Sequence, residues 1–341
     1  MEKIGKQKKG IALIVAIFFV LSLFLGAFAG CDQQNRPAPT PQDGENQPEK
    51  GGGEGQKATE LWQEEPTISL YMNEEDTVKE LPLEEYLLGV VAAEMDPKWP
   101  QEALAAQAIL ARTFTLERIH SLGGVPERNT DASTDVEEFQ AYDASRINDG
   151  VRQAVEQTRG QVATYQGALI KAWFFADGGG QTAASALEGL AYDKEETPYI
   201  HSVEDPGSAI TEEGNKAWTA SIPLAEARKK IQEFTGQDPG EITAAEVVEK
   251  GESGRALKVK AGNAVLGGPA FRLALGSTEV KSALITELKV ESGSLKVAGK
   301  GYGHGVGMSQ WGARAMAEQG KSAKEIIQYF FNGVEVEKLY S

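Results

Sequence analysis

A carboxylate on an apolar helix face is the residue of this chain with the clearest chemical potential. Leu87, Val90 and Val91 recur at helical spacing, and Glu94 falls on the same face. Burying a lone charge is costly, so such a carboxyl group tends to hold a proton. A carboxylic acid that is still protonated near neutral pH is what general acid catalysis requires. The alternative is that Glu94 caps the helix end or pairs with an arginine such as Arg112, since structural ion pairs also perturb pKa values.

Two helices that meet at a proline corner must position Glu94. Pro97 stops the first helix and Pro100 opens the second, which is rich in alanine and ends at Gly123. Gln107 and Arg112 are polar residues within the apolar run of this second helix. Because buried polar groups usually have partners, we expect both to make specific contacts.

The first residues predict an anchor outside the cytoplasm. Four lysines precede an unbroken apolar run from Ile11 to Gly30, which is typical of a secretion signal or signal anchor and is long enough to span a bilayer. The sequence Phe-Ala-Gly-Cys at 28–31 resembles a bacterial lipobox, in which Cys31 would be lipid-modified. The alternative is a plain transmembrane anchor with an incidental cysteine. In either case, residues 1–31 tether the chain to the extracytoplasmic face of the cell membrane.

Composition divides and constrains the remaining chain. Residues 32–63 are rich in Pro, Gln, Gly and Glu and predict a disordered linker, whereas residues 64–341 predict a folded domain. The 341-residue chain has a net charge of −16, and because residues 1–30 carry +3, the remainder carries −19. Such an acidic surface argues against nucleic acid as a partner. Cys31 is the only cysteine, which excludes a disulfide framework and a cysteine-based metal site.

Hydrophobic patterns in residues 64–341 predict an α+β fold, with the two helices packed against mixed or antiparallel sheets. The expected strands and the further helices are spread along the chain. Strands are predicted at 67–72, 162–165, 168–175, 218–222, 257–260, 285–290 and 295–297. Helices are predicted at 150–158 and 223–234. A further helix follows the glycine-rich run and ends near residue 320, and a last helix begins at a capping box at 322–325 and ends at 332.

A glycine-rich run near the C-terminus is a second candidate site. Glycine occupies every second position from Gly299 to Gly307, which permits unusual dihedral angles and close approach to a ligand. The spacing fits neither the dinucleotide fingerprint nor the P-loop, so nucleotide binding is not expected. His304 within the run could act as a base, a substrate contact or a metal ligand, or could brace the loop by hydrogen bonding. The spacing of the three histidines does not support a zinc site.

Five dispersed motifs together resemble the stage II sporulation protein D family, which includes LytB-type amidase enhancers. They are YLLGVVAAEM at 86–95, WPQEALAAQA at 99–108, ARTF at 111–114, GGQT at 179–182 and GHGVGMSQWGA at 303–313. The resemblance implies a peptidoglycan lytic transglycosylase with Glu94 as its acid and base, acting with a partner amidase on peptide-stripped glycan strands during engulfment in sporulation. It places the substrate-binding walls at Thr182, Tyr199, Asp205, His304, Ser309 and Gln310, with Gln107 and Arg112 supporting Glu94. It implies no cofactor and, because this chain lacks the cysteines associated with zinc in some relatives, no metal.

Two other functions fit parts of the sequence. The same fold could bind glycan and activate an amidase without catalysis, in which case Glu94 would be dispensable. A substrate-binding lipoprotein of a transporter would fit a lipid anchor, but it predicts two similar lobes, and no internal duplication is evident in the sequence.

Overall fold

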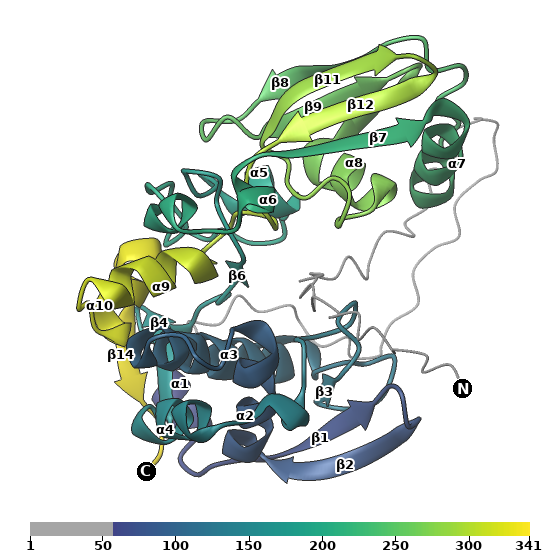
Figure 1. Ribbon diagram of the computed structural model, residues 1–341. Helices are drawn as coiled ribbons and strands as arrows, with labels where there is room; N and C mark the ends of the chain where they lie inside the picture. Colours follow the sequence, from purple (N-terminus) through teal and green to yellow (C-terminus); the bar gives the residue numbers. More distant parts are fainter. Residues whose placement is uncertain (1–56) are drawn as a thin grey trace, which may run out of the picture.

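The computed structural model describes residues 57–341, and their arrangement confirms the α+β fold (Figure 1). The first element, α1 (Ala58–Leu61), lies within the range predicted as linker: Ala58 is buried, and its N–H donates to the carbonyl of Gly167 at 2.9 Å. Order therefore begins before residue 64. The predictions for Cys31 and the rest of residues 1–56 lie outside the described residues. Within residues 57–341, no helix combines the length and apolar character that crossing a membrane requires.

The first hydrophobic core surrounds a central buried helix. Its elements are β1 (Thr67–Met72), β2 (Thr77–Pro82), α2 (Leu83–Glu94), α3 (Gln101–Leu122), β3 (Ala132–Ser133), η1 (Ala144–Arg146), α4 (Asp149–Gln157), α9 (Gln310–Glu318) and α10 (Ala323–Phe330). The helix α3 packs against α2, α4, α9 and α10, so its alanines contact neighbours on several sides. Gly123 ends it in the left-handed conformation, as predicted.

Short strands link distant parts of the chain around this core. β4 (Gln161–Tyr165) pairs with both β5 (Ala168–Leu169) and β14 (Glu335–Lys338), whereas β6 (Phe174–Phe175) pairs in parallel with β13 (Met308–Ser309). The predicted strand at 168–175 is therefore two short strands in different sheets. This split matters for function because the β6–β13 pair fixes the start of α9.

Residues 218–299 form a second core, which we call the inserted domain. It contains β7 (Trp218–Pro223), α7 (Leu224–Thr235), β8 (Ala245–Lys250), β9 (Ala256–Ala261), β10 (Ala264–Gly267), α8 (Gly268–Leu275), β11 (Ile285–Glu291) and β12 (Ser294–Gly299). Its two antiparallel sheets have the orders β10-β9-β8 and β11-β12-β7. Figure 1 shows these elements gathered at one end of the molecule, away from α2 and α3. Short elements join the two ends: α5 (Ala186–Leu190), η2 (Pro206–Ala209) and α6 (Glu213–Lys216).

The glycine-rich run has the predicted unusual backbone, but it packs against protein. Gly301, Gly303, Gly305 and Gly307 all have positive φ. A Cβ atom at Gly305 would lie 2.4 Å from Nε of Arg255, and one at Gly301 would lie 2.7 Å from the carbonyl oxygen of Asp177. The expected close approach is therefore to neighbouring chain segments, and the glycines bring the inserted domain against the first core.

Candidate active site

Glu94 is the last residue of α2 and is buried, with 5% of its surface exposed. Burial raises the pKa of its carboxyl group to about 7, against the opposing effects of hydrogen bonds from Ala141 and Gln310. Its position at the negative end of the helix dipole also disfavours the carboxylate. No neighbouring carboxylate or arginine is among the causes of the shifted pKa. Glu94 can therefore hold a proton near neutral pH.

Neutral amides surround the two carboxyl oxygens of Glu94. The backbone N–H of Ala141 donates to Oε1 at 2.9 Å. Nε2 of Gln310 lies 3.4 Å from Oε2 of Glu94 and 3.4 Å from Oε1 of Gln107. Within residues 57–341, the buried Nε2 of Gln107 has no hydrogen-bond partner. The structure thus brings Gln107 and Gln310 to the site of Glu94, while a contact of Gln310 with glycan and the support of Glu94 by Gln107 stay predictions.

The start of α9 fixes the position of Gln310. β13 ends at Ser309, and the hydroxyl of Ser309 accepts a hydrogen bond from the N–H of Gly312 at 3.0 Å, which makes it the N-cap of α9. The same hydroxyl donates to the carbonyl of Ala176 at 3.3 Å, just beyond β6. Ser309 thus holds the element that presents Gln310, and a direct contact of Ser309 with glycan stays a prediction.

Arg112 lies in a different cluster from Glu94. Its guanidinium forms two hydrogen bonds with Glu84, of 2.9 and 2.6 Å, and a third with the carbonyl of Gln161. Burial would raise the pKa of Glu84, but Arg112 and the N–H of Gly160 lower it below its ordinary value. The expectation that Arg112 supports Glu94 is therefore corrected: the arginine is fully buried and joins α2, α3 and β4. Glu84, the second residue of α2, supplies the carboxylate that pairs with Arg112.

Three of the expected glycan contacts are buried and bound to the backbone. The hydroxyl of Thr182 accepts from the N–H of Val203 at 2.9 Å, and the hydroxyl of Tyr199 accepts from the N–H of Lys171 at 2.8 Å. Asp205 accepts from the N–H groups of Gly178 and Gly207, and burial, with nearby Asp177, raises its pKa. These side chains fix the loops between the two cores, and their contact with glycan stays a prediction.

His304 uses both ring nitrogens within the protein. The N–H of Val306 donates to Nδ1 at 3.0 Å, so Nε2 carries the proton and donates to the carbonyl of Phe174 at 3.0 Å. Burial, together with Arg272, lowers the pKa of His304 to about 3. Of the roles that the sequence left open, these contacts match the bracing of the glycine loop, because a neutral ring with both nitrogens engaged is unsuited to proton transfer.

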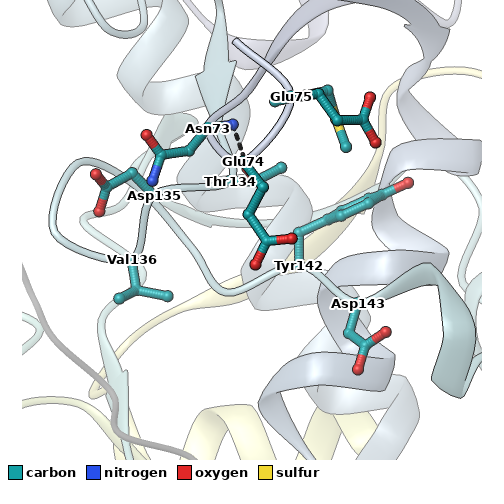
Figure 2. A pocket seen from close by; sticks show the side chains of 9 residues that line it. Asn73, Glu74, Glu75, Thr134, Asp135, Val136, Tyr142 and Asp143 are labelled. Atoms are coloured by element: carbon teal, nitrogen blue, oxygen red, sulfur yellow. Dashed lines mark hydrogen bonds between the residues drawn. The ribbon is translucent and has the colours of Figure 1, made fainter. Parts of the chain in front are cut away.

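A surface pocket lies beside the loop that contributes Ala141. This cavity of about 460 Å³ is bounded by the turn between β1 and β2, by residues 134–136 and by Tyr142 and Asp143 (Figure 2). Glu74, Glu75 and Asp135 contribute further carboxylates to its wall. None of the predicted site residues lines it. The ring of Tyr142 stacks on Tyr86 of α2, with centroids 5.9 Å apart, and so helps to fix the loop against the helix that carries Glu94.

Sequence reasoning missed the backbone donor at Ala141. A main-chain N–H has no side-chain signature, and neither a helix nor a strand is predicted between Gly123 and residue 149. The one local signal is Gly89 on α2, where a Cβ atom would lie 2.2 Å from the ring of Tyr142. This glycine lets residues 140–143 lie directly on α2.

Comparisons with known proteins match the region around α2 and α3 and the inserted domain separately. The family described as "Stage II sporulation protein" matches residues 71–165, which include α2 and α3. A domain of unknown function matches residues 207–307, which include the inserted domain.

Curated relatives align over most of the chain. Stage II sporulation protein D of Bacillus amyloliquefaciens is 33% identical over 79% of this chain and 78% of its own length. The protein of the same name from Bacillus subtilis is 30% identical over 85% of this chain and 82% of its own length. An "Amidase enhancer" of Bacillus subtilis is 28% identical over 72% of this chain but only 39% of its own length.

Proposed function

The chain belongs to the stage II sporulation protein D family, and we propose that it is a peptidoglycan lytic transglycosylase with Glu94 as its catalytic acid and base. The observation that carries this proposal is the environment of Glu94: a buried carboxyl group with a pKa of about 7, contacted by neutral amides. A protonated acid next to donors that can stabilise its anion suits a group that gives up and regains a proton in one catalytic cycle.

The proposed reaction needs one carboxyl group and no water. Glu94 donates its proton to the glycosidic oxygen as the bond from that oxygen to the anomeric carbon of the muramic residue breaks. The resulting carboxylate takes the proton of the 6-hydroxyl of the same muramic residue. That oxygen then bonds to the anomeric carbon, which closes a 1,6-anhydro ring and returns the proton to Glu94. A hydrolase would instead use two carboxyl groups at a defined separation.

The amides near Glu94 fit this cycle better than a cation would. An arginine within hydrogen-bond distance would hold the carboxylate ionised and lower its pKa, whereas Gln310 and Ala141 stabilise the anion more weakly. Among the described residues, the buried Nε2 of Gln107 has no hydrogen-bond partner and lies beside Gln310, and we propose that it contacts the substrate in the bound complex. In this scheme, Glu94 is the catalytic residue and Gln310 positions it.

The setting of the reaction is also a proposal. Residues 1–31 would tether the chain to the extracytoplasmic face of the membrane, through lipid on Cys31 or through a transmembrane segment, and residues 32–56 would give it reach. The substrate would be peptidoglycan strands whose stem peptides a partner amidase has removed, during cell-wall remodelling in sporulation.

Product analysis tests the proposal. Detergent-solubilised full-length protein would be incubated with amidase-treated glycan strands, and the new ends identified by mass spectrometry. We expect 1,6-anhydro-muramic ends from the wild type and a loss of at least a hundredfold in rate for Glu94→Gln, because the amide cannot donate the proton. Glu85→Gln is the matched control, since Glu85 lies on the same helix but is exposed. Normal turnover by a folded Glu94→Gln variant would overturn the assignment.

The similarity to an amidase enhancer supports one other candidate function, activation of a cell-wall amidase without catalysis. It predicts that the purified chain releases no sugar but accelerates an amidase acting on intact peptidoglycan. The Glu94→Gln variant separates the two: it would still activate the amidase under this second hypothesis, and it would leave the glycan strands uncut under the first.

A further inference from the structure

Two tryptophans and an arginine form a partly exposed surface near Glu94. Trp99, in the corner between α2 and α3, and Trp311, on α9, have ring centroids 4.9 Å apart at an interplanar angle of 58°. The guanidinium carbon of Arg314 lies 5.3 Å from the centroid of Trp99 and 5.0 Å from that of Trp311. All three side chains are half-buried. We call these three residues the tryptophan surface.

Chain connectivity ties the tryptophan surface to the catalytic carboxyl group. Trp311 directly follows Gln310, whose amide contacts Glu94. Trp99 follows Glu94 by five residues, in a turn held by the hydrogen bond from its N–H to the carbonyl of Asp96 at 2.9 Å. The two rings therefore belong to chain segments that adjoin Glu94 and its partner Gln310, which places them where a longer ligand bound at Glu94 could extend.

The chemistry of the surface combines an apolar platform with a positive charge. Tryptophan rings offer large, rigid faces for the C–H groups of a sugar ring, and a half-buried tryptophan keeps part of its area available. The Nε of Arg314 donates to Glu318 at 2.8 Å, and within residues 57–341 its two terminal nitrogens have no hydrogen-bond acceptor. Those terminal N–H groups are the ones that bind a carboxylate in a fork. The chain has a net charge of −16, so an arginine beside the site gives this surface a positive charge that most of the protein lacks.

We propose that the tryptophan surface is a saccharide subsite that takes a sugar ring carrying a free carboxylate. This inference rests on the proposed function and deepens it. The muramic residue of a glycan strand bears a lactyl carboxyl group, which is an amide while a stem peptide is attached and an anion once the peptide has been removed. Arg314 would pair with the anion while the tryptophan rings hold the sugar, so the surface would distinguish stripped strands from peptide-bearing strands.

Binding measurements in the Glu94→Gln background test the subsite without turnover. The probes are a tetrasaccharide of alternating N-acetylglucosamine and N-acetylmuramic acid with free carboxylates, the same tetrasaccharide with its carboxylates converted to methylamides, and the N-acetylglucosamine tetramer. We expect the free-carboxylate probe to bind at least about tenfold more tightly than the other two, because a hydrogen-bonded pair with a charged group is involved. Arg314→Gln should abolish this preference and leave the weaker binding of the neutral probes.

Two tryptophan variants and one arginine control complete the test. Trp99→Ala and Trp311→Ala should each weaken the binding of all three probes by about tenfold, because each substitution removes part of the apolar platform that every sugar ring contacts. Arg228→Gln should change nothing, because Arg228 pairs with Asp238 on the inserted domain. Circular dichroism identifies any variant that fails to fold. Equal binding of all three probes to the wild type, or unchanged preference in folded Arg314→Gln, would overturn the proposal.

The outcome is separable from that of the catalytic proposal. If the wild type makes no anhydro ends but prefers the free-carboxylate probe through Arg314, the subsite stands and the transglycosylase assignment fails. If anhydro ends form and the probes bind alike, the reaction stands and the subsite fails.

Discussion

At the scale of single residues, the chemistry of Glu94 depends on which partners it has and which it lacks. Its position on an apolar helix face predicted burial, and the structure confirms that burial raises the pKa of the carboxyl group. The sequence could not decide which glutamate Arg112 would pair with, because Glu84 and Glu94 both lie on α2 and α3 can present an arginine to either. Packing decides it: Arg112 meets Glu84, and Glu94 meets Gln310.

The first prediction concerns the pH dependence of the reaction. The acid form of Glu94 begins the proposed cycle, and the pKa of the free protein is about 7. We therefore expect kcat/KM to be level just below pH 7 and to fall about tenfold for each pH unit above it. Initial rates of anhydro-end formation between pH 5 and 9 measure this. A rate that rises through pH 7 would mean that the carboxylate form is required first.

The second prediction concerns stability. Because the native pKa is raised from 4.5 to about 7, the native state binds the proton more tightly than the unfolded chain, and stability falls as pH rises through this window. Glu94→Gln removes this loss, so it should raise the free energy of unfolding by up to about 3 kcal/mol at pH 8 and by almost nothing at pH 4. Urea unfolding at both pH values checks this, and an equal effect at pH 4 and pH 8 would contradict it.

At the scale of elements, helices were predicted more faithfully than the strands that fix the site. The boundaries of α2, α3 and α10 follow from prolines, glycines and a capping box, which are local signals. Residues 168–175 look like one strand in sequence, but β5 and β6 pair with partners that lie far apart in the chain, which no local pattern reveals. For the same reason, the sequence could not show that His304 braces the glycine loop against Phe174 of β6.

The third prediction tests the role of Arg112 as a link between helices. Arg112→Met leaves the carboxylate of Glu84 buried without its cation, so it should cost about 3–5 kcal/mol of stability. In the fraction that stays folded at low temperature, the product-forming rate should remain within about threefold of wild type, because Arg112 does not contact Glu94. A variant that is stable but inactive would contradict this prediction and would show that Arg112 supports the catalytic carboxyl group of Glu94.

At the scale of the whole molecule, the region predicted as one domain contains two hydrophobic cores. Composition alone could not reveal the inserted domain, because its strands and helices have the same patterns as the rest of the fold. A buried arginine contributes to the junction: Arg255 donates to the carbonyls of Gly178 and Gln181 at 3.0 and 2.9 Å, and burial lowers its pKa to about 10. Gly305 leaves the space that this guanidinium occupies.

The fourth prediction concerns this junction. Arg255→Met should remove the hydrogen bonds to Gly178 and Gln181 while leaving each core intact, so calorimetry should resolve two unfolding transitions where the wild type shows one. Arg228→Gln, on the exposed side of the inserted domain, is the control and should unfold in the same way as the wild type. A single transition in the Arg255→Met variant, merely shifted to lower temperature, would show that the cores do not depend on this arginine for their coupling.

The most direct test of the proposed reaction follows the oxygen that attacks the anomeric carbon. The full-length protein would act on peptide-stripped glycan strands in water enriched in ¹⁸O, and mass spectrometry would measure the masses of the new muramic ends. Intramolecular attack by the 6-hydroxyl predicts anhydro ends that contain no ¹⁸O. Reducing ends that carry one ¹⁸O atom would show that water is the nucleophile, and the protein would then be a hydrolase that uses a second carboxyl group.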